Sequence, residues 1–139
     1  MCIITSARQG RGGVFFTPDG IIKTTFSWGL GTETNNIAAA LALWQGLVIA
    51  KNKGITRLNV LGDSRIVIQA MVEGNLPNHL HLRQLLSKIH SLARSFHKAE
   101  FYHVLRIHNK EVDLVANLGS MLSPGSLQIN GSHEFFPLP

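Results

Sequence analysis

Apolar positions recur along the chain with two different periods, and the changes of period mark the predicted elements. Short runs rich in apolar and β-branched residues at 1–5, 14–17 and 21–30 predict three strands at the start. Two later runs, 57–61 and 100–107, predict two more. Because helical patterns separate these later strands, the chain is typical of an α/β layered domain with a mixed sheet.

Four segments have the spacing of helices. The segment 36–53 is apolar on nearly every face and stops at Gly54, so it must be packed on more than one side. The segment 64–73 follows a strand directly, whereas 79–97 is amphipathic with a leucine-rich face. A short helix over 109–118 completes the predicted order β-β-β-α-β-α-α-β-α.

Length and composition favour a single globular domain. The chain has 139 residues, of which 45% are hydrophobic. From residue 120 onward it is rich in Gly, Ser, Pro and Asn and shows no clear period. We therefore predict one domain over 1–119, followed by a flexible C-terminal tail over 120–139.

Net charge indicates the class of partner, and cysteine content indicates the cellular compartment. Thirteen Lys and Arg oppose eight Asp and Glu, a net charge of +5, which favours a polyanionic partner and nucleic acid first. Cys2 is the only cysteine, so no intrachain disulfide forms, which fits an intracellular protein of cytoplasm or nucleus. The longest apolar stretch, 37–43, is too short to span a bilayer. We expect a monomer without membrane association.

Two acidic residues occupy positions that suit a binding site. Asp63 follows the apolar run 58–62, and acids at the carboxyl end of a strand in an open α/β sheet lie where ligands and metals bind. Asp113 opens the last predicted helix. Asn35 and Asn36 begin the long apolar helix. All four side chains also have a purely structural interpretation, because Asp and Asn are common at helix starts.

Three motifs occur in one order and at separations that match a known family. Residues 34–39 with 42–47 are similar to a TNN-x-A-E…AL-x-x-GL helix, and 61–64 to a strand-end DS motif. Residues 104–117 are similar to an R-x-x-N-x-x-AD-x-x-AN ending. Over roughly 12–119 the chain resembles the ribonuclease H family, type 1, in the form found in plant retroelement-derived proteins. The resemblance implies a three-layer fold with a five-stranded mixed sheet flanked by helices.

The resemblance also implies a reaction, the metal-dependent endonucleolytic hydrolysis of the RNA strand of RNA/DNA hybrids. In the family four carboxylates hold two Mg²⁺ (or Mn²⁺) ions. Here Asp63 and Asp113 match two of the four. The helix Glu falls on Ala39, and the first-strand acid falls on Thr5 or Ser6 if the following loop is shortened, or otherwise before the first residue. Both positions are degenerate, so any bound metal is expected to bind weakly.

The implied partner is an RNA/DNA hybrid or double-stranded RNA. In the family, residues at the positions of Asn35 and Asn36 reach across the wide minor groove of such duplexes. Arg83 and Arg94 lie on the polar face of an amphipathic helix, which is either a phosphate-contacting face or simply a solvated one. Trp44, on the apolar helix, is interpreted as core and not as a platform for a stacked base. The candidate nucleic-acid-binding residues are Thr34, Asn35, Asn36, Arg83, Arg94 and Arg106.

Two functions from different classes follow from these residues. The first is a ribonuclease H-type endonuclease whose activity is impaired or lost, because two of four carboxylates are missing. The second is a non-catalytic module of the same fold that binds nucleic acid or a protein. An incomplete or altered sequence is a third explanation, since an Asp upstream of Met1 together with a Glu at Ala39 would complete the carboxylate set.

Overall fold

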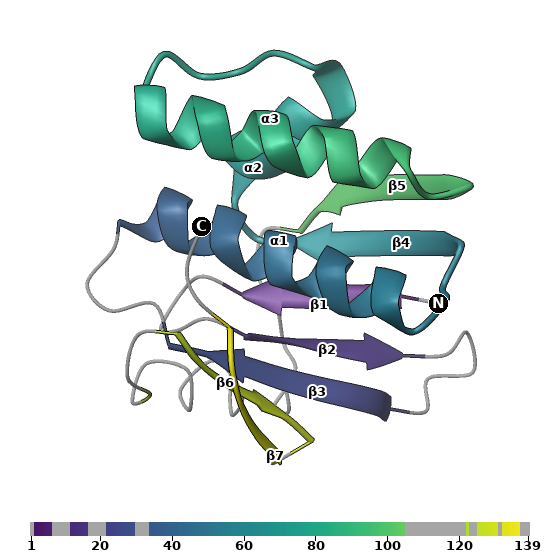
Figure 1. Ribbon diagram of the computed structural model, residues 1–139. Helices are drawn as coiled ribbons and strands as arrows, with labels where there is room; N and C mark the ends of the chain where they lie inside the picture. Colours follow the sequence, from purple (N-terminus) through teal and green to yellow (C-terminus); the bar gives the residue numbers. More distant parts are fainter. Residues whose placement is uncertain are drawn as a thin grey trace.

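A single mixed sheet forms the frame of the protein (Figure 1). The structure is a computed structural model, and it describes residues 2–6, 12–16, 22–29, 34–104, 122, 125–130 and 132–136. The strand order is β5-β4-β1-β2-β3-β6-β7, with β1 parallel to β4, β4 parallel to β5, and the other neighbours antiparallel. The strands are β1 (Cys2–Ser6), β2 (Gly12–Phe16), β3 (Ile22–Trp28), β4 (Arg57–Gly62), β5 (Lys98–His103), β6 (Ser126–Ile129) and β7 (Ser132–Phe135).

In the part of the chain that the structure describes, three helices pack with this sheet, and each begins at a residue that caps it. Thr34 accepts a hydrogen bond from the Ile37 amide at the start of α1. Ser64 caps α2 in the same way, and Gly74 ends that helix at φ +75°, a left-handed conformation that glycine adopts without a Cβ clash. The Nδ1 atom of His79 accepts from the Leu82 amide and caps α3. The helices are α1 (Asn35–Asn52), α2 (Arg65–Glu73) and α3 (Leu80–Arg94).

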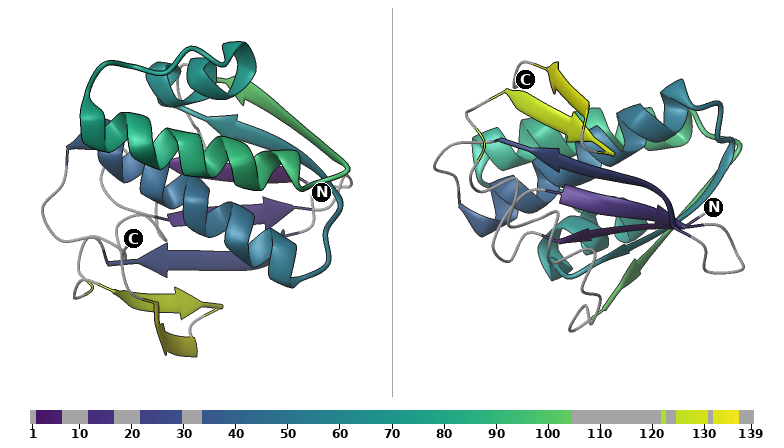
Figure 2. Two further views of the ribbon diagram at one scale, coloured as in Figure 1. Left: turned by 45° about the horizontal axis from the view of Figure 1, so that its top comes forward. Right: turned by 90° about the horizontal axis from the view of Figure 1, so that it is seen from below.

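The helices α1 and α3 lie side by side on one face of the sheet and pack against each other (Figure 2). In α1, Ala38 and Leu43 are both buried and lie on different sides of the helix, which confirms the predicted packing on more than one side. The leucine-rich face of α3 is buried, and the helix contacts α1, α2 and β5. No helix among the described residues has the length and apolar content needed to cross a bilayer.

A glycine sets the distance between α1 and β1. A Cβ atom at Gly46 would lie 2.3 Å from the Cδ1 atom of Ile3 and 3.5 Å from the Phe26 ring. Ile3 and Phe26 are both almost fully buried, so neither side chain has free space to move into. The absence of a side chain at Gly46 therefore allows α1 to lie close against β1, the strand that contains the candidate position Thr5.

Gly46→Ala is expected to destabilise the protein. Overpacking a filled core costs about 1–3 kcal/mol, of which the better helix propensity of Ala offsets at most about 1 kcal/mol. Urea unfolding would measure the loss. Ile3→Val removes the clashing Cδ1 atom, so the double variant should lose less stability than the two single variants added together. Strict additivity would contradict the contact.

The sequence-based prediction of the C-terminal segment differs from the structure. Composition predicts a flexible segment over 120–139, whereas β6 and β7 lie within it and extend the sheet from the predicted five strands to seven. The strand β6 pairs with β3, and Leu127 is buried at 2% exposure. Two four-residue strands carry too few apolar residues to show a period, which is why composition alone suggested a tail. The dipeptide Asn-Gly at 130–131 is a sequence typical of two-residue hairpins, and this was the signal available for the pairing of Ile129 with Ser132.

The remaining predicted elements agree with the structure where it describes them. The helices predicted over 36–53, 64–73 and 79–97 correspond to α1, α2 and α3, within three residues at each end. The predicted strand 100–107 corresponds to β5, which begins two residues earlier. The predicted helix over 109–118 lies outside the described residues.

Candidate functional site

The candidate site lies at the end of the sheet where β1 and β4 finish and α1 begins (Figure 1). The two strands are parallel neighbours, and Thr5 is paired with Gly62. Asp63 comes directly after Gly62, so the β4 acid and the last residues of β1 lie at the same edge. This edge lies at the carboxyl ends of parallel strands, where α/β folds place ligands.

Asp63 shares a small pocket with Ala39, one of the two degenerate positions. Ala39 is 7% exposed and lies seven residues, or two helical turns, before Gly46, so it is on the face of α1 turned towards the sheet. The pocket thus joins the start of α1 to the β4–α2 turn, with one carboxylate and mainly apolar walls. Its lining residues are Ala39, Leu43, Gly62, Asp63, Ser64, Val67 and Ile68.

The sheet register distinguishes the two candidates for the first-strand position. Successive residues of a strand alternate between the two sheet faces, so Thr5 is on the same face as Ile3 and Ser6 on the other. Ile3 faces Gly46 of α1. Thr5 is therefore the β1 position on the face of Ala39, and the three elements β1, α1 and β4 bring Thr5, Ala39 and Asp63 to one end of the sheet.

Ser64 connects the two helix starts at this edge. Its hydroxyl oxygen accepts a hydrogen bond of 3.4 Å from the Val67 amide and donates one of 3.4 Å to the Oδ1 atom of Asn36. Asn36 is half-buried, whereas Asn35 is exposed. The helix caps are Thr34 and Ser64, so the structure does not use Asp63, Asn35 or Asn36 as caps. No local sequence pattern predicts the Ser64–Asn36 contact, because the two residues lie in different elements.

The donors described at this edge do not fit a two-metal site. Mg²⁺ needs several hard oxygen ligands, usually carboxylates. Asp63 and the Ser64 hydroxyl are the oxygen-bearing side chains of the pocket, and Ala39 offers only a methyl group. Among the described residues, no three His, Cys, Asp or Glu side chains lie close enough to hold one ion. Asp113 and Arg106 lie outside the described residues, so their predicted roles stay predictions.

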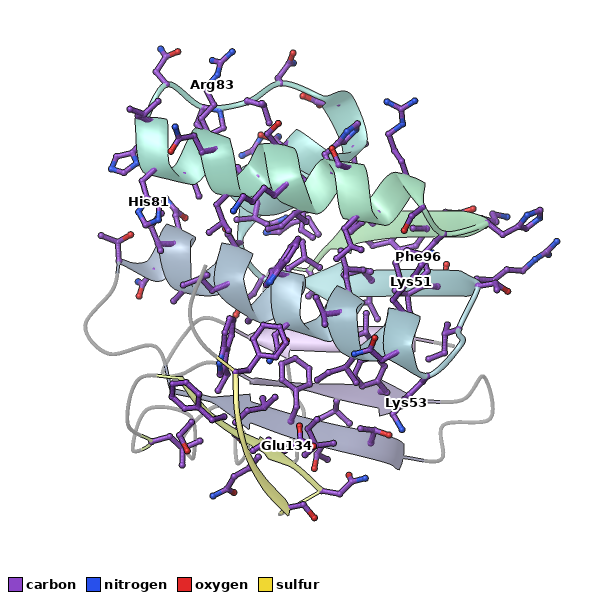
Figure 3. The ribbon with its side chains drawn as sticks, viewed as in Figure 1. Lys51, Lys53, His81, Arg83, Phe96 and Glu134 are labelled. Carbon is purple, nitrogen blue, oxygen red and sulfur yellow. The ribbon has the colours of Figure 1, made fainter. Side chains whose placement is uncertain are left out.

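The two arginines of α3 lie at opposite ends of that helix. Arg83 and Arg94 are both exposed, and eleven residues separate them, roughly 16 Å along a helix axis. Arg83 lies near the start of α3, at the end of the molecule where α1 begins (Figure 3). Only Arg83 is therefore placed to assist a ligand held at the Asp63 edge.

Shifted pKa values occur on β5, away from the pocket. The Tyr102 hydroxyl donates to Glu100 and, together with the Lys98 ammonium 2.9 Å away, lowers the pKa of Glu100; the same hydrogen bond raises the pKa of Tyr102. Glu100 pairs with the exposed Asn59, whereas the neighbouring Val60 is buried under the helices. The group thus belongs to the sheet face opposite the candidate site and plays no part in it.

Comparison with known proteins places this arrangement in a family. A family model described as reverse transcriptase-like matches residues 4–119. The bifunctional protein Rv2228c of Mycobacterium tuberculosis is 31% identical over 109 residues, which are 78% of this chain and 30% of that protein. An uncharacterized protein of Mycobacterium bovis, Mb2253c, matches to the same extent. The chain thus spans about a third of the length of these curated relatives.

Solved structures show the same fold. The N-terminal RNase H domain of Rv2228c has 27% identity and a TM-score of 0.73, covering 86% of this chain and 99% of that one. RNase H1 from Halobacterium salinarum has 26% identity and a TM-score of 0.71, covering 86% and 97%. LC11-RNase H1, solved in complex with an RNA/DNA hybrid, has 22% identity and a TM-score of 0.74, covering 84% and 94%. The predicted α/β ribonuclease H-like fold is confirmed.

Proposed function

The chain belongs to the reverse transcriptase-like family, whose fold is that of ribonuclease H, and we propose that it binds RNA/DNA hybrids but cleaves them poorly. The proposed binding edge is the end of the sheet formed by Asp63, the start of α1 and the β4–α2 turn. The hybrid bound to LC11-RNase H1, a protein of the same fold, supports this choice of ligand. The net charge of +5 agrees with a polyanionic partner.

The observation that carries the proposal is the methyl group of Ala39 in the pocket of Asp63. In the family a divalent ion stabilises charge on the scissile phosphate and activates water. Holding two such ions requires carboxylates at the positions of Ala39 and Thr5, and the chain has none there. Asp63, with Asp113, would hold Mg²⁺ or Mn²⁺ only weakly. Binding of a duplex does not depend on the missing acids. The chain can therefore bind a hybrid and still cleave it poorly.

The start of α1 supplies the groups for recognition. The exposed amide of Asn35 and the half-buried amide of Asn36 lie at the N-terminus of α1, where the helix dipole also favours phosphate. The Ser64 hydroxyl fixes the Oδ1 atom of Asn36 and so fixes which way its amide is turned. Amides held in this way suit the 2′-hydroxyls and base edges of a wide minor groove. Double-stranded RNA presents the same groove, so it belongs to the proposed ligands.

Further parts of the proposal concern the setting of the domain. We propose a monomer acting in the cytoplasm or nucleus, of the plant retroelement-derived form of the family. The assignment to the plant retroelement-derived form rests on the three motifs, because their residues over 34–47, 61–64 and 104–117 match that form.

Binding of a labelled RNA/DNA hybrid in EDTA tests the proposal without any cleavage. We expect affinity to fall steeply as salt rises, because phosphate contacts release counterions. Asn35→Ala should weaken binding, whereas Asn52→Ala, the other exposed terminal asparagine of α1, should not. No binding at low salt, or equal effects of the two variants, would overturn the proposed edge and favour a protein-binding module. Rapid cleavage by the unmodified chain in Mg²⁺ would overturn the proposed loss of activity.

A further inference from the structure

A groove runs between α1 and α3 on the outer side of the helices, apart from the Asp63 pocket. It is open to solvent and offers a volume of about 590 Å³. Trp44, assigned to the core from its sequence position, is only half-buried and forms one wall. Trp44 lies nine residues beyond Asn35, roughly 13 Å along α1, so the groove and the proposed hybrid edge are different surfaces. The α1–α3 groove is lined by Trp44, Ser87, Lys88, Ser91, Leu92 and Ser95.

The two helices that form the groove carry only positive charge. Neither α1 nor α3 contains an Asp or Glu, while they hold Lys51, Arg83, Lys88 and Arg94. Such a surface attracts a polyanion and repels a basic partner. The groove is therefore complementary in charge to a chain of phosphates or carboxylates.

Lys51 fixes a positive charge at the C-terminal end of the groove. Its Nζ atom donates a hydrogen bond of 2.8 Å to the carbonyl of Ser95, a lining residue, and lies 5.1 Å from the centre of the Phe96 ring (Figure 3). The contact holds the ends of α1 and α3 together. The groove thus keeps its shape without a ligand, which lowers the entropy that binding costs.

The chemistry of the lining distinguishes between polyanions. A nucleotide combines a flat aromatic base with a phosphate, and the groove combines Trp44 with Lys88 and the exposed hydroxyl of Ser91. An acidic peptide has carboxylates but no repeating flat ring for Trp44. In a duplex the bases are stacked inside, so their faces cannot reach the tryptophan. We propose that the α1–α3 groove binds single-stranded nucleic acid, with a base against Trp44 and phosphates against Lys88 and Ser91.

Fluorescence measurements with a labelled oligo(dT) test the proposal on the full chain. Trp44→Ala should weaken binding about tenfold, since stacking on an aromatic ring contributes ~1–3 kcal/mol per base, and Trp44→Phe should retain most of it. The intrinsic fluorescence of the chain should be quenched by the oligonucleotide, and this quenching should disappear in Trp44→Phe, because the other tryptophan, Trp28, is fully buried. Circular dichroism would confirm that each variant is folded.

A pair of lysine variants distinguishes a contact in the groove from a general effect of positive charge on oligo(dT) binding. Lys88→Gln should lower the slope of log affinity against log salt by about 0.7, one phosphate contact of a single strand. Lys53→Gln, an equal charge change at an exposed residue outside the groove lining, should change it less. Equal effects of the two, no effect of Trp44→Ala, or competition by polyglutamate as strong as by unlabelled oligo(dT) would overturn the proposal.

The hybrid-binding edge provides the remaining control. Asn35→Ala should leave oligo(dT) binding unchanged, because that residue lies at the other surface. An unmodified chain that binds oligo(dT) but does not bind the hybrid would count against the proposed function alone. The reverse result would count against the α1–α3 groove alone.

Discussion

Ala39→Glu combined with Thr5→Asp is expected to raise Mg²⁺-dependent cleavage of an RNA/DNA hybrid by about 10²-fold or more over the unmodified chain. The size follows from the rate that enzymes lose with one well-placed electrostatic group, about 10²–10³. Both positions lie at the sheet end of Asp63, since Ala39 shares its pocket and Thr5 pairs with Gly62 immediately before it. Ala39→Glu alone should improve metal binding yet leave turnover poor, because no acid then stands on β1.

Ser6→Asp provides the matched control for this experiment. Alternation places Ser6 on the opposite face of β1 from Ile3 and Thr5, so Ala39→Glu with Ser6→Asp should remain as slow as Ala39→Glu alone. Equal recovery by the two double variants would show that the register does not determine the site. Robust cleavage by the unmodified chain that Asp63→Asn abolishes would show that another residue completes the site.

Thermal unfolding gives a second measure that does not depend on activity. Glu at position 39 would place a carboxylate in a mostly apolar pocket beside Asp63, and two like charges without a cation destabilise each other. Ala39→Glu should therefore lower the melting temperature in EDTA. Mg²⁺ should reverse part of this loss, because an ion that binds the folded state stabilises it by mass action. A melting temperature that does not respond to Mg²⁺ would mean that the added acid and Asp63 share no ion.

Sequence reasoning placed Asp63 at a strand end and Thr34 at a helix start, but it could not supply the geometry between them. The apolar run before Asp63 and the helix start at Thr34 determine strand and helix locally, so both positions were predictable. Thr5 and Ser6 could not be separated, because the choice depends on the pairing of β1 with β4 across more than fifty residues. The half-buried state of Trp44 was missed for a similar reason. How far α3 covers α1 is a property of helix packing and leaves no mark on the period of α1 itself.

The C-terminal hairpin, β6 and β7, could not be predicted for the same reason, because it depends on pairing between residues far apart in the sequence. It gains stability from β3, to which β6 and Asn130 are joined by hydrogen bonds between distant residues. The Asn130 amide donates to the Thr25 carbonyl at 2.9 Å, and the Asn130 Oδ1 atom accepts from the Thr25 amide at 2.9 Å. The Trp28 indole donates to the Phe136 carbonyl at 3.0 Å, and the two rings meet edge to face at 5.8 Å. None of these pairings is visible in a window of local sequence.

Truncation after Gly119 is expected to cost several kcal/mol of stability and to cause self-association. The truncation removes Leu127, a buried side chain of a kind whose loss alone costs about 2–5 kcal/mol. It also leaves the Trp28 indole without its acceptor and uncovers the edge of β3, and an open edge strand is a template for pairing with another chain. Urea unfolding and sedimentation of the full and truncated chains would measure both effects.

Point variants separate the hairpin from a general effect of shortening the chain. Leu127→Ala should lower stability by about 2–5 kcal/mol, whereas Phe135→Ala should change it little, because Phe135 is 74% exposed. Asn130→Ala should also destabilise, since it removes the bond to the Thr25 amide at a residue with φ +50°, a conformation that Asn tolerates better than Ala. The family match ends at residue 119, so a truncated chain as stable and as monomeric as the full one would make the hairpin a dispensable addition. Loss of stability would instead make it part of the sheet that holds β1 and the candidate site in place.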